Sequence, residues 1–190
     1  MKQLYAPWRE NYTVSVASAD AKASADAKAM ADMMADMNAK NEKTEHTECV
    51  FCNHFADNQD ENHFIIKRFK HIIVMLNLFP YNAGHLLLLP MDHKAHLSEL
   101  SPDTRQELIE LANHSSEILK KILHCDGLNI GLNLGKAAGA GIPSHLHMHV
   151  LPRFTGDTNF LPTLADTKAI SFDLAKIYRQ LKPEFDKLML

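Results

Sequence analysis

The sequence predicts an α+β fold with a largely antiparallel sheet. Three observations favour this fold: short apolar runs of strand length, one long helical pattern, and the order in which they occur. Strand patterns come first, a helix follows, further strands come next, and a helix lies near the C-terminus. The chain has 190 residues, of which 46% are hydrophobic and 23% charged, and this suits one soluble globular domain with a substantial core.

The first predicted strands lie between residues 64 and 90. Apolar runs over 64–69 and 71–77 indicate two strands, and the turn residues of 79–84 indicate a loop after them. Residues 85–90 contain four consecutive leucines, which is typical of a buried strand. We therefore expect three strands in this part of the chain.

A long helix follows these strands. Ser101 suits the N-cap position, Pro102 suits the first helical position, and the helix should end near His124. Five apolar residues form its buried stripe: Leu108, Leu111, Ile118, Leu119 and Ile122. Further strands are expected over 128–133 and in a histidine-rich run after it, and residues 165–181 should contain the C-terminal helix.

Residues 15–47 differ in composition from the rest of the chain. The sequence ASADAK at 17–22 is repeated at 23–28, and alanine, methionine and aspartate continue from there. The segment lacks a broad hydrophobic stripe, so it is a surface helix or a poorly ordered low-complexity segment. We interpret it as an insertion without chemistry.

Composition also excludes several classes of protein. The net charge of −3 does not suit a surface that coats nucleic acid, and no apolar run approaches the roughly 20 residues of a membrane span. Residues 1–9 lack the apolar core of a signal peptide, so the cytoplasm is the expected location. The three cysteines are an odd number and fit a reducing compartment, where Cys125 has no assigned role.

The histidine-rich run over 144–153 is the main chemical signal. His145, His147 and His149 alternate with apolar residues, so on a strand they would share one face. Histidine supplies nucleophiles, proton carriers and metal ligands near neutral pH. Three interpretations follow: histidines that are merely half-exposed, one metal ion bound by all three, or nucleophilic catalysis by one with support from the others.

A loop rich in glycine and alanine, residues 133–141, precedes this run. Glycine lets the backbone approach a ligand closely and direct N–H groups at anionic oxygens, and Lys136 could add charge. The spacing is not that of a P-loop. The loop is either a phosphate site beside the histidines or a flexible linker.

Cys49 and Cys52 form a CxxC pair. No thioredoxin-like context surrounds it, so a zinc site is favoured over a redox pair or cysteines without metal. A zinc site needs two more ligands, and spacing leaves four candidates: His85, His93, His96 and His145.

At this point the sequence resembles a known family. Residues 145–151 match the signature His-φ-His-φ-His-φ-φ, with φ apolar, of the histidine triad (HIT) family of nucleotide hydrolases and nucleotidyl transferases. Four further segments are similar to its diadenosine tetraphosphate phosphorylase or hydrolase branch: 5–9, 80–85, 131–141 and 156–160. The resemblance implies an antiparallel five-stranded sheet with a long helix and a C-terminal helix. It divides the chain into four parts: an N-terminal segment 1–14, the insertion 15–47, a HIT domain 48–182 and a tail 183–190.

The resemblance also implies roles for individual residues. His147 would be the nucleophile that attacks the α-phosphorus, with its other ring nitrogen held by a backbone carbonyl. His149 would hydrogen-bond the phosphate and stabilise charge in the transition state. Five substrate-binding positions follow by the same resemblance: Asn77 at the ribose, His85 beside the active site, Asn133 at the phosphate, and Gly139 and Gly141 with backbone N–H groups.

Zinc-containing members of the family imply the ligands of a structural Zn²⁺. In this sequence they correspond to Cys49, Cys52, His93 and His145, which would form a closed four-ligand site. The implied enzyme cleaves dinucleoside polyphosphates, with phosphate or water as acceptor, leaves an AMP-like product and forms a homodimer. Two alternatives remain open: a nucleoside phosphoramidase, and a zinc-stabilised nucleotide-binding module with little turnover.

Overall fold

The computed structural model describes residues 2–5, as backbone only, and residues 49–190. The expectations for residue 1, for 6–14 and for the insertion 15–47 lie outside the described residues. The chain divides into two compact units. One contains the described residues 2–5 and 158–173, and the other contains 49–157 and 174–190.

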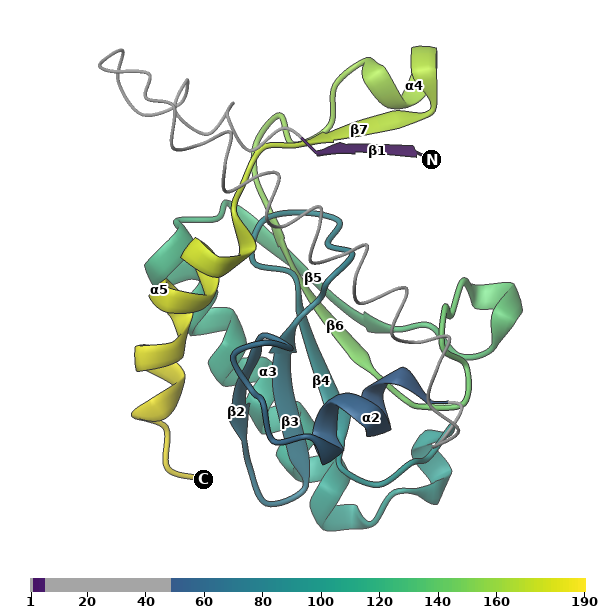
Figure 1. Cartoon of the computed structure of the whole chain (residues 1–190), viewed down its shortest axis with the longest axis vertical. Coiled ribbons are helices and arrows are strands. Elements are labelled where there is room, and N and C mark those ends of the chain that lie inside the picture. Colours follow the sequence, from purple (N-terminus) through teal and green to yellow (C-terminus); the bar gives the residue numbers. More distant parts are fainter. Residues whose placement is uncertain (1, 6–48) are drawn as a thin grey trace. The chain divides into compact units, whose positions relative to one another are not determined.

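The larger unit contains the predicted five-stranded antiparallel sheet, with strand order β2-β3-β4-β6-β5 (Figure 1). Its strands are β2 (Ile65–Arg68), β3 (Ile72–Leu76), β4 (Leu86–Pro90), β5 (Gly127–Leu132) and β6 (Met148–Arg153). Four of the strands are shorter than the predicted runs by one to four residues, and β5 begins one residue earlier than predicted. The fold class is therefore as predicted.

Three helices accompany the sheet: α2 (Val50–Ala56), α3 (Pro102–Leu123) and α5 (Leu174–Asp186). Helix α3 begins as predicted, because the Ser101 hydroxyl accepts a hydrogen bond from the Thr104 N–H at 3.0 Å. It ends where His124 adopts a left-handed conformation at φ 51°. No helix in the described part of the chain is both long and apolar enough to cross a bilayer.

The four leucines of β4 are buried because helices cover both faces of the sheet. Leu87 and Leu89 belong to a core cluster with Phe51 of α2. On the other face α3 contacts β4, and α5 packs against α3 and β2. Figure 1 shows α2 on the near side of the sheet and α3 behind it. A strand between two helical layers has no solvent face, so it is apolar at every position.

The C-terminal region differs from the sequence prediction. Instead of one helix within 165–181, a short helix α4 (Leu161–Ala165) and a strand β7 (Thr167–Ile170) precede α5. Strand β7 pairs in parallel with β1 (Lys2–Tyr5), so both belong to the smaller unit. Residues 158–173 therefore interrupt the continuous domain expected over 48–182.

The expected tail over 183–190 also begins too early. Helix α5 continues through Pro183 to Asp186, and Phe185 is fully buried. Its buried residues recur at helical spacing: Leu174, Ile177, Tyr178, Leu181 and Phe185. Burial of this apolar face outweighs the hydrogen bond that a proline removes from a helix.

A carboxylate network ties the loop before β4 to the end of β6. Asp157 accepts hydrogen bonds from Arg153 Nε at 2.7 Å and Nη2 at 3.0 Å, and from Asn82 Nδ2 at 2.7 Å. Asn82 also donates to the Pro152 carbonyl at 2.9 Å. Hydrogen bonds from Arg153 hold the pKa of Asp157 well below its usual range. The network positions the loop that carries Tyr81 and His85.

We expect Asp157→Asn to lower the free energy of unfolding by about 1–3 kcal/mol at pH 7, because it removes charge-assisted hydrogen bonds. The pKa of Asp157 is depressed in the folded state, so its contribution is fully present above the unfolded pKa of about 3.9 and is lost progressively as the pH falls from there toward the lower folded pKa. Urea denaturation at pH 7 and pH 3 measures both effects.

Asp186→Asn is the matched control. Like Asp157, Asp186 forms an ion pair with a residue four positions earlier, Lys182, at 2.7 Å. The Asp186 side chain is 49% exposed, however, whereas that of Asp157 is 9% exposed. This change should alter stability by only about 0.5 kcal/mol or less. Equal losses in the two variants would contradict the structural role of Asp157.

Candidate functional site

The three histidines of the signature do not share one strand face as expected. Strand β6 begins at Met148, so only His149 belongs to it, while His145 and His147 lie in the segment before it. Both are buried, at 0% and 7% exposure. The reason is that this segment is held by other partners: the Leu146 N–H donates to the Lys94 carbonyl, at 2.6 Å, instead of to a neighbouring strand.

The ring of His147 has a defined tautomer. Its Nδ1 lies 2.8 Å from the backbone carbonyl of His145. A carbonyl oxygen only accepts, so Nδ1 carries the hydrogen, and in the neutral ring Nε2 keeps a free lone pair. The expected backbone partner of this ring is therefore present in the geometry.

His149 receives a hydrogen bond from a second buried histidine. The Tyr81 N–H donates to His85 Nδ1 at 3.2 Å, so His85 must donate from Nε2 to His149 Nδ1, at 2.9 Å. His149 then carries its own hydrogen on Nε2. Burial, together with neighbouring histidines, lowers the pKa of His85 to about 3 and that of His149 to about 4. Both rings are therefore neutral at pH 7, as this chain of donors requires.

His85 lies next to His149, at the side of the site. Its ring is fully buried and does not line the pocket described below. Both of its nitrogens are used, at Tyr81 and at His149. His85 is therefore placed to orient the His149 ring through this hydrogen bond, as hydrogen-bond partners commonly do for functional histidines.

The two predicted asparagines lie near these histidines. The Asn133 side-chain amide is 3.5 Å from His149 Nε2, at the edge of hydrogen-bond distance. The Asn77 amide nitrogen is 3.3 Å from His85 Nδ1, and its oxygen accepts from the Phe79 N–H at 2.9 Å. Asn77 also lines the pocket.

The two predicted glycines have different surroundings. Gly139, at φ 87°, ends a single 3-10 turn, η3 (Lys136–Ala138), and its N–H donates to the Lys136 carbonyl at 3.0 Å. That N–H is therefore used within the loop, which differs from the expected phosphate contact. Gly141 lines the pocket, and a Cβ there would meet open space.

The pocket holds about 860 Å³ of space, including its opening to solvent. Strand pairing explains how His149 reaches it: β6 places His149 opposite Leu87 of β4, so it points to the face that α2 covers. Most of the lining is apolar. The residues that matter for its chemistry are Phe51, His54, Asn77, Tyr81, His147 and His149.

Three of these residues were not identified from the sequence. The Phe51 ring packs edge-on against His145, with centroids 5.5 Å apart, and at a tilt against His147, with centroids 5.4 Å apart. Tyr81 lies beside His149, with centroids 5.9 Å apart and planes at 21°. His54 is buried in the same wall. Phe51 and His54 flank the second cysteine of the CxxC pair, and no local pattern marks them as lining residues.

The four predicted metal ligands form one cluster. Their ligand atoms all lie within 4.8 Å of one another. His145 Nδ1 is 3.4 Å from Cys49 Sγ and 3.6 Å from Cys52 Sγ, and His93 Nδ1 is 3.2 Å from Cys52 Sγ. Tetrahedral zinc with Zn–S and Zn–N distances of roughly 2.3 and 2.0 Å places ligand atoms at about such separations. The donor set therefore fits zinc.

The outer contacts of the cluster also fit a metal site. His145 Nε2 donates to the Pro90 carbonyl at 2.9 Å, which leaves Nδ1 free to face the cysteines. Burial and the neighbouring Cys49 raise the pKa of the Cys52 thiol to about 11, so without a cation it is protonated. Among the residues whose side chains the structure describes, this cluster includes neither His85 nor His96.

Known proteins agree with this fold. The sequence profile of the HIT domain matches residues 58–156. The chain is 36% identical over 126 residues to an AP-4-A phosphorylase of Mycobacterium tuberculosis, covering 66% of this chain and 65% of the relative. The match therefore spans less than two thirds of that relative's length. It is 30% identical over 134 residues to a HIT-like protein of Methanocaldococcus jannaschii, covering 70% of this chain and 98% of the relative.

A solved structure extends the comparison to three dimensions. The crystal structure of a Zn-bound histidine triad family protein from Mycobacterium smegmatis is similar with a TM-score of 0.60 and 27% identity. The match covers 74% of this chain and 94% of that one. With the family profile matched over the sheet and the histidine signature, the chain belongs to the histidine triad (HIT) family.

Proposed function

We propose that this protein cleaves dinucleoside polyphosphates, such as diadenosine tetraphosphate, through a nucleotide bound covalently to His147. The observation that carries the proposal is the His147 ring, whose Nδ1–H is held by the His145 carbonyl while it lines the pocket. Its Nε2 lone pair is then available for attack. The relative named AP-4-A phosphorylase supports this substrate class.

The proposed reaction has two steps. In the first, His147 Nε2 attacks the α-phosphorus, the bond to the bridging oxygen breaks, and ATP leaves diadenosine tetraphosphate. In the second, an oxygen of phosphate or water displaces His147 from phosphorus and releases ADP or AMP. His149 would donate its Nε2–H to a phosphate oxygen on which negative charge develops, at a site where a preorganised donor is most effective.

The cluster of Cys49, Cys52, His93 and His145 would hold a structural zinc ion in this protein. Bound there, the ion would supply a closed tetrahedral link between the start of α2, the loop after β4 and the segment before β6. Four protein ligands leave no position for a substrate, so its contribution would be to folding and alignment. The homodimer and the cytoplasmic location stay predictions.

We expect His147→Ala to reduce cleavage of diadenosine tetraphosphate on the order of 10⁴-fold or more, because it removes the nucleophile. The fold should persist, which circular dichroism and thermal unfolding would check. His114→Ala, a change on α3 away from the pocket, is the control and should keep wild-type turnover. A His147→Ala protein with near wild-type turnover would refute the assignment.

The products of wild-type cleavage identify the acceptor. In phosphate buffer, attack by phosphate on the intermediate would give ADP and ATP, whereas attack by water would give AMP and ATP. We expect every reaction to release ATP, because His147 attacks at the α-phosphorus. Separation of the products by ion-exchange chromatography measures this, and two molecules of ADP formed in the absence of phosphate would contradict the proposed intermediate.

We expect Cys49→Ser to lose the zinc ion and to be less stable than the wild type. At a free zinc concentration 1,000 times the dissociation constant, the lost binding is worth about 4 kcal/mol of unfolding free energy. Metal analysis and thermal unfolding measure the two effects, and a chelator added to wild type should reproduce the loss. Cys125→Ser should retain the metal. One zinc per chain in Cys49→Ser would contradict the ligand set.

A further inference from the structure

His54 is a polar residue in the apolar part of the pocket wall. It lies on α2 one turn from Phe51, and both side chains line the pocket. Only 7% of the residue's surface is exposed, and Nδ1 has no hydrogen-bond partner among the described residues. A buried polar atom without a partner costs free energy, and beside a pocket it indicates a partner that arrives with the ligand.

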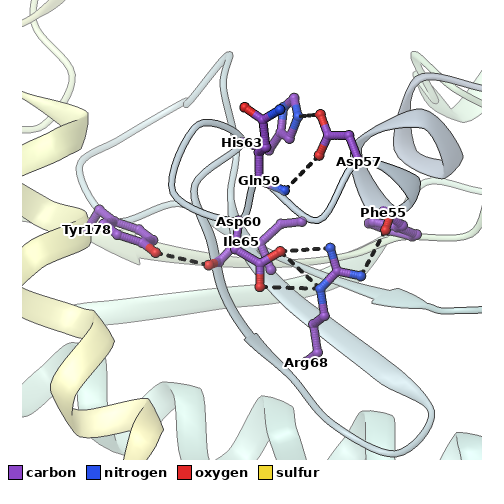
Figure 2. Close-up of polar contacts among 8 residues, drawn as sticks. All are labelled: Phe55, Asp57, Gln59, Asp60, His63, Ile65, Arg68 and Tyr178. Carbon is purple, nitrogen blue, oxygen red and sulfur yellow. Dashed lines mark hydrogen bonds and ion pairs between the residues drawn. The ribbon is translucent and has the colours of Figure 1, made fainter.

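The surrounding contacts hold the His54 ring in place. It stacks on His63, with ring centroids 4.1 Å apart and planes at 15°. His63 in turn donates from Nε2 to the carboxylate of Asp57, which also accepts from the Gln59 N–H at 2.9 Å (Figure 2). The His54 ring is thus supported by an anchored neighbour, which makes its edge a preorganised hydrogen-bonding group.

The end of α2 that carries His54 is also fixed to the sheet. Figure 2 shows the Arg68 guanidinium between Asp60 and the carbonyl of Phe55. The distances are 2.7 Å from Nη2 to the Asp60 carboxylate and 2.9 Å from Nη1 to the Phe55 carbonyl. Because Phe55 directly follows His54, these bonds restrain the backbone next to the ring.

Three other polar side chains of the pocket already have partners, either in the proposed reaction or within the protein. His147 and His149 face the phosphate, and the Asn77 side chain is bonded to the loop beside them. In a nucleotide the base is the part farthest from the phosphate, and the edge of a purine farthest from its ribose carries N1 and the 6-substituent. A base that enters the apolar part of this pocket would bring that edge toward the wall that contains His54.

We infer that His54 hydrogen-bonds the 6-substituent edge of a purine base and thereby selects purines that carry a 6-substituent. This inference rests on the proposed function, since it requires a nucleotide in the pocket. A neutral imidazole can donate to the 6-oxo group of guanine or accept from the 6-amino group of adenine. In both cases a purine that lacks a 6-substituent loses the bond.

Calorimetric binding of three nucleotides tests the inference: AMP, GMP and purine riboside 5′-monophosphate, which has hydrogen at position 6. In the wild type we expect the preferred one of AMP and GMP to bind about 5- to 10-fold more tightly than the unsubstituted analogue, the value of one net hydrogen bond. In His54→Leu, which keeps the bulk of the side chain, the ratio should fall below about 2-fold.

His71→Leu is the matched control. His71 also has a buried ring nitrogen, Nε2, without a partner among the described residues, but it does not line the pocket. This variant should keep the wild-type ratio.

Equal affinity of the wild type for all three nucleotides would overturn the inference without recourse to any variant. A His54→Leu protein that weakens all three equally would also overturn it, because the residue would then act only by packing. If the wild type binds no nucleotide, the proposed function fails together with the inference. If it binds all three tightly without discrimination, the inference alone fails.

Discussion

The position of His145 determines most of the site. Its backbone carbonyl accepts the Nδ1–H of His147 at 2.8 Å, and its own Nε2–H donates to the Pro90 carbonyl at the end of β4 at 2.9 Å. Its Nδ1 faces the two cysteines. One residue therefore links the ligand cluster, a central strand and the proposed nucleophile. Small errors in the placement of a reacting group are costly, so through this link the proposed zinc ion would help to align the proposed nucleophile.

Protonation in the pocket depends on burial. The chain of hydrogen bonds from the Tyr81 N–H through His85 to His149 requires both rings to be neutral. In a protonated imidazole both nitrogens carry hydrogen, so Nδ1 of His85 or of His149 could not accept a hydrogen bond. Burial lowers both pKa values far below neutrality. The His149 ring, which lines the pocket, then carries its hydrogen on Nε2 and is a neutral hydrogen-bond donor.

Helix α2 connects the two halves of the site although it is only seven residues long. Cys49 precedes α2 and Cys52 lies within it, and both belong to the cluster of four candidate metal ligands. Phe51 packs against both His145 and His147. His54 and Phe51 form a wall of the pocket. Anchoring α2 through the cluster at one end and through Arg68 at the other would hold the pocket wall at a constant distance from the reacting histidines.

The sequence by itself determined the element types and the chemical groups of the site. Apolar spacing and the Ser101–Pro102 start predicted the strands and α3, because these signals act within a few residues. Spacing narrowed the predicted zinc ligands to the CxxC pair with a few histidines, and the family resemblance named His93 and His145 among them. It did not predict β7, since the pairing partner of that strand is near the opposite end of the chain, where no local pattern indicates the pairing.

Only the tertiary structure decided which groups meet and how their rings are oriented. Cys52 meets His93 across 41 positions, and Cys49 meets His145 across 96. The fold places His145 and His147 outside the strand on which alternation had put them, makes His85 a partner of His149, and brings His54 into the pocket. The physical reason is that ring orientation, tautomer and burial depend on neighbours distant in sequence, whereas periodicity reports only the local backbone.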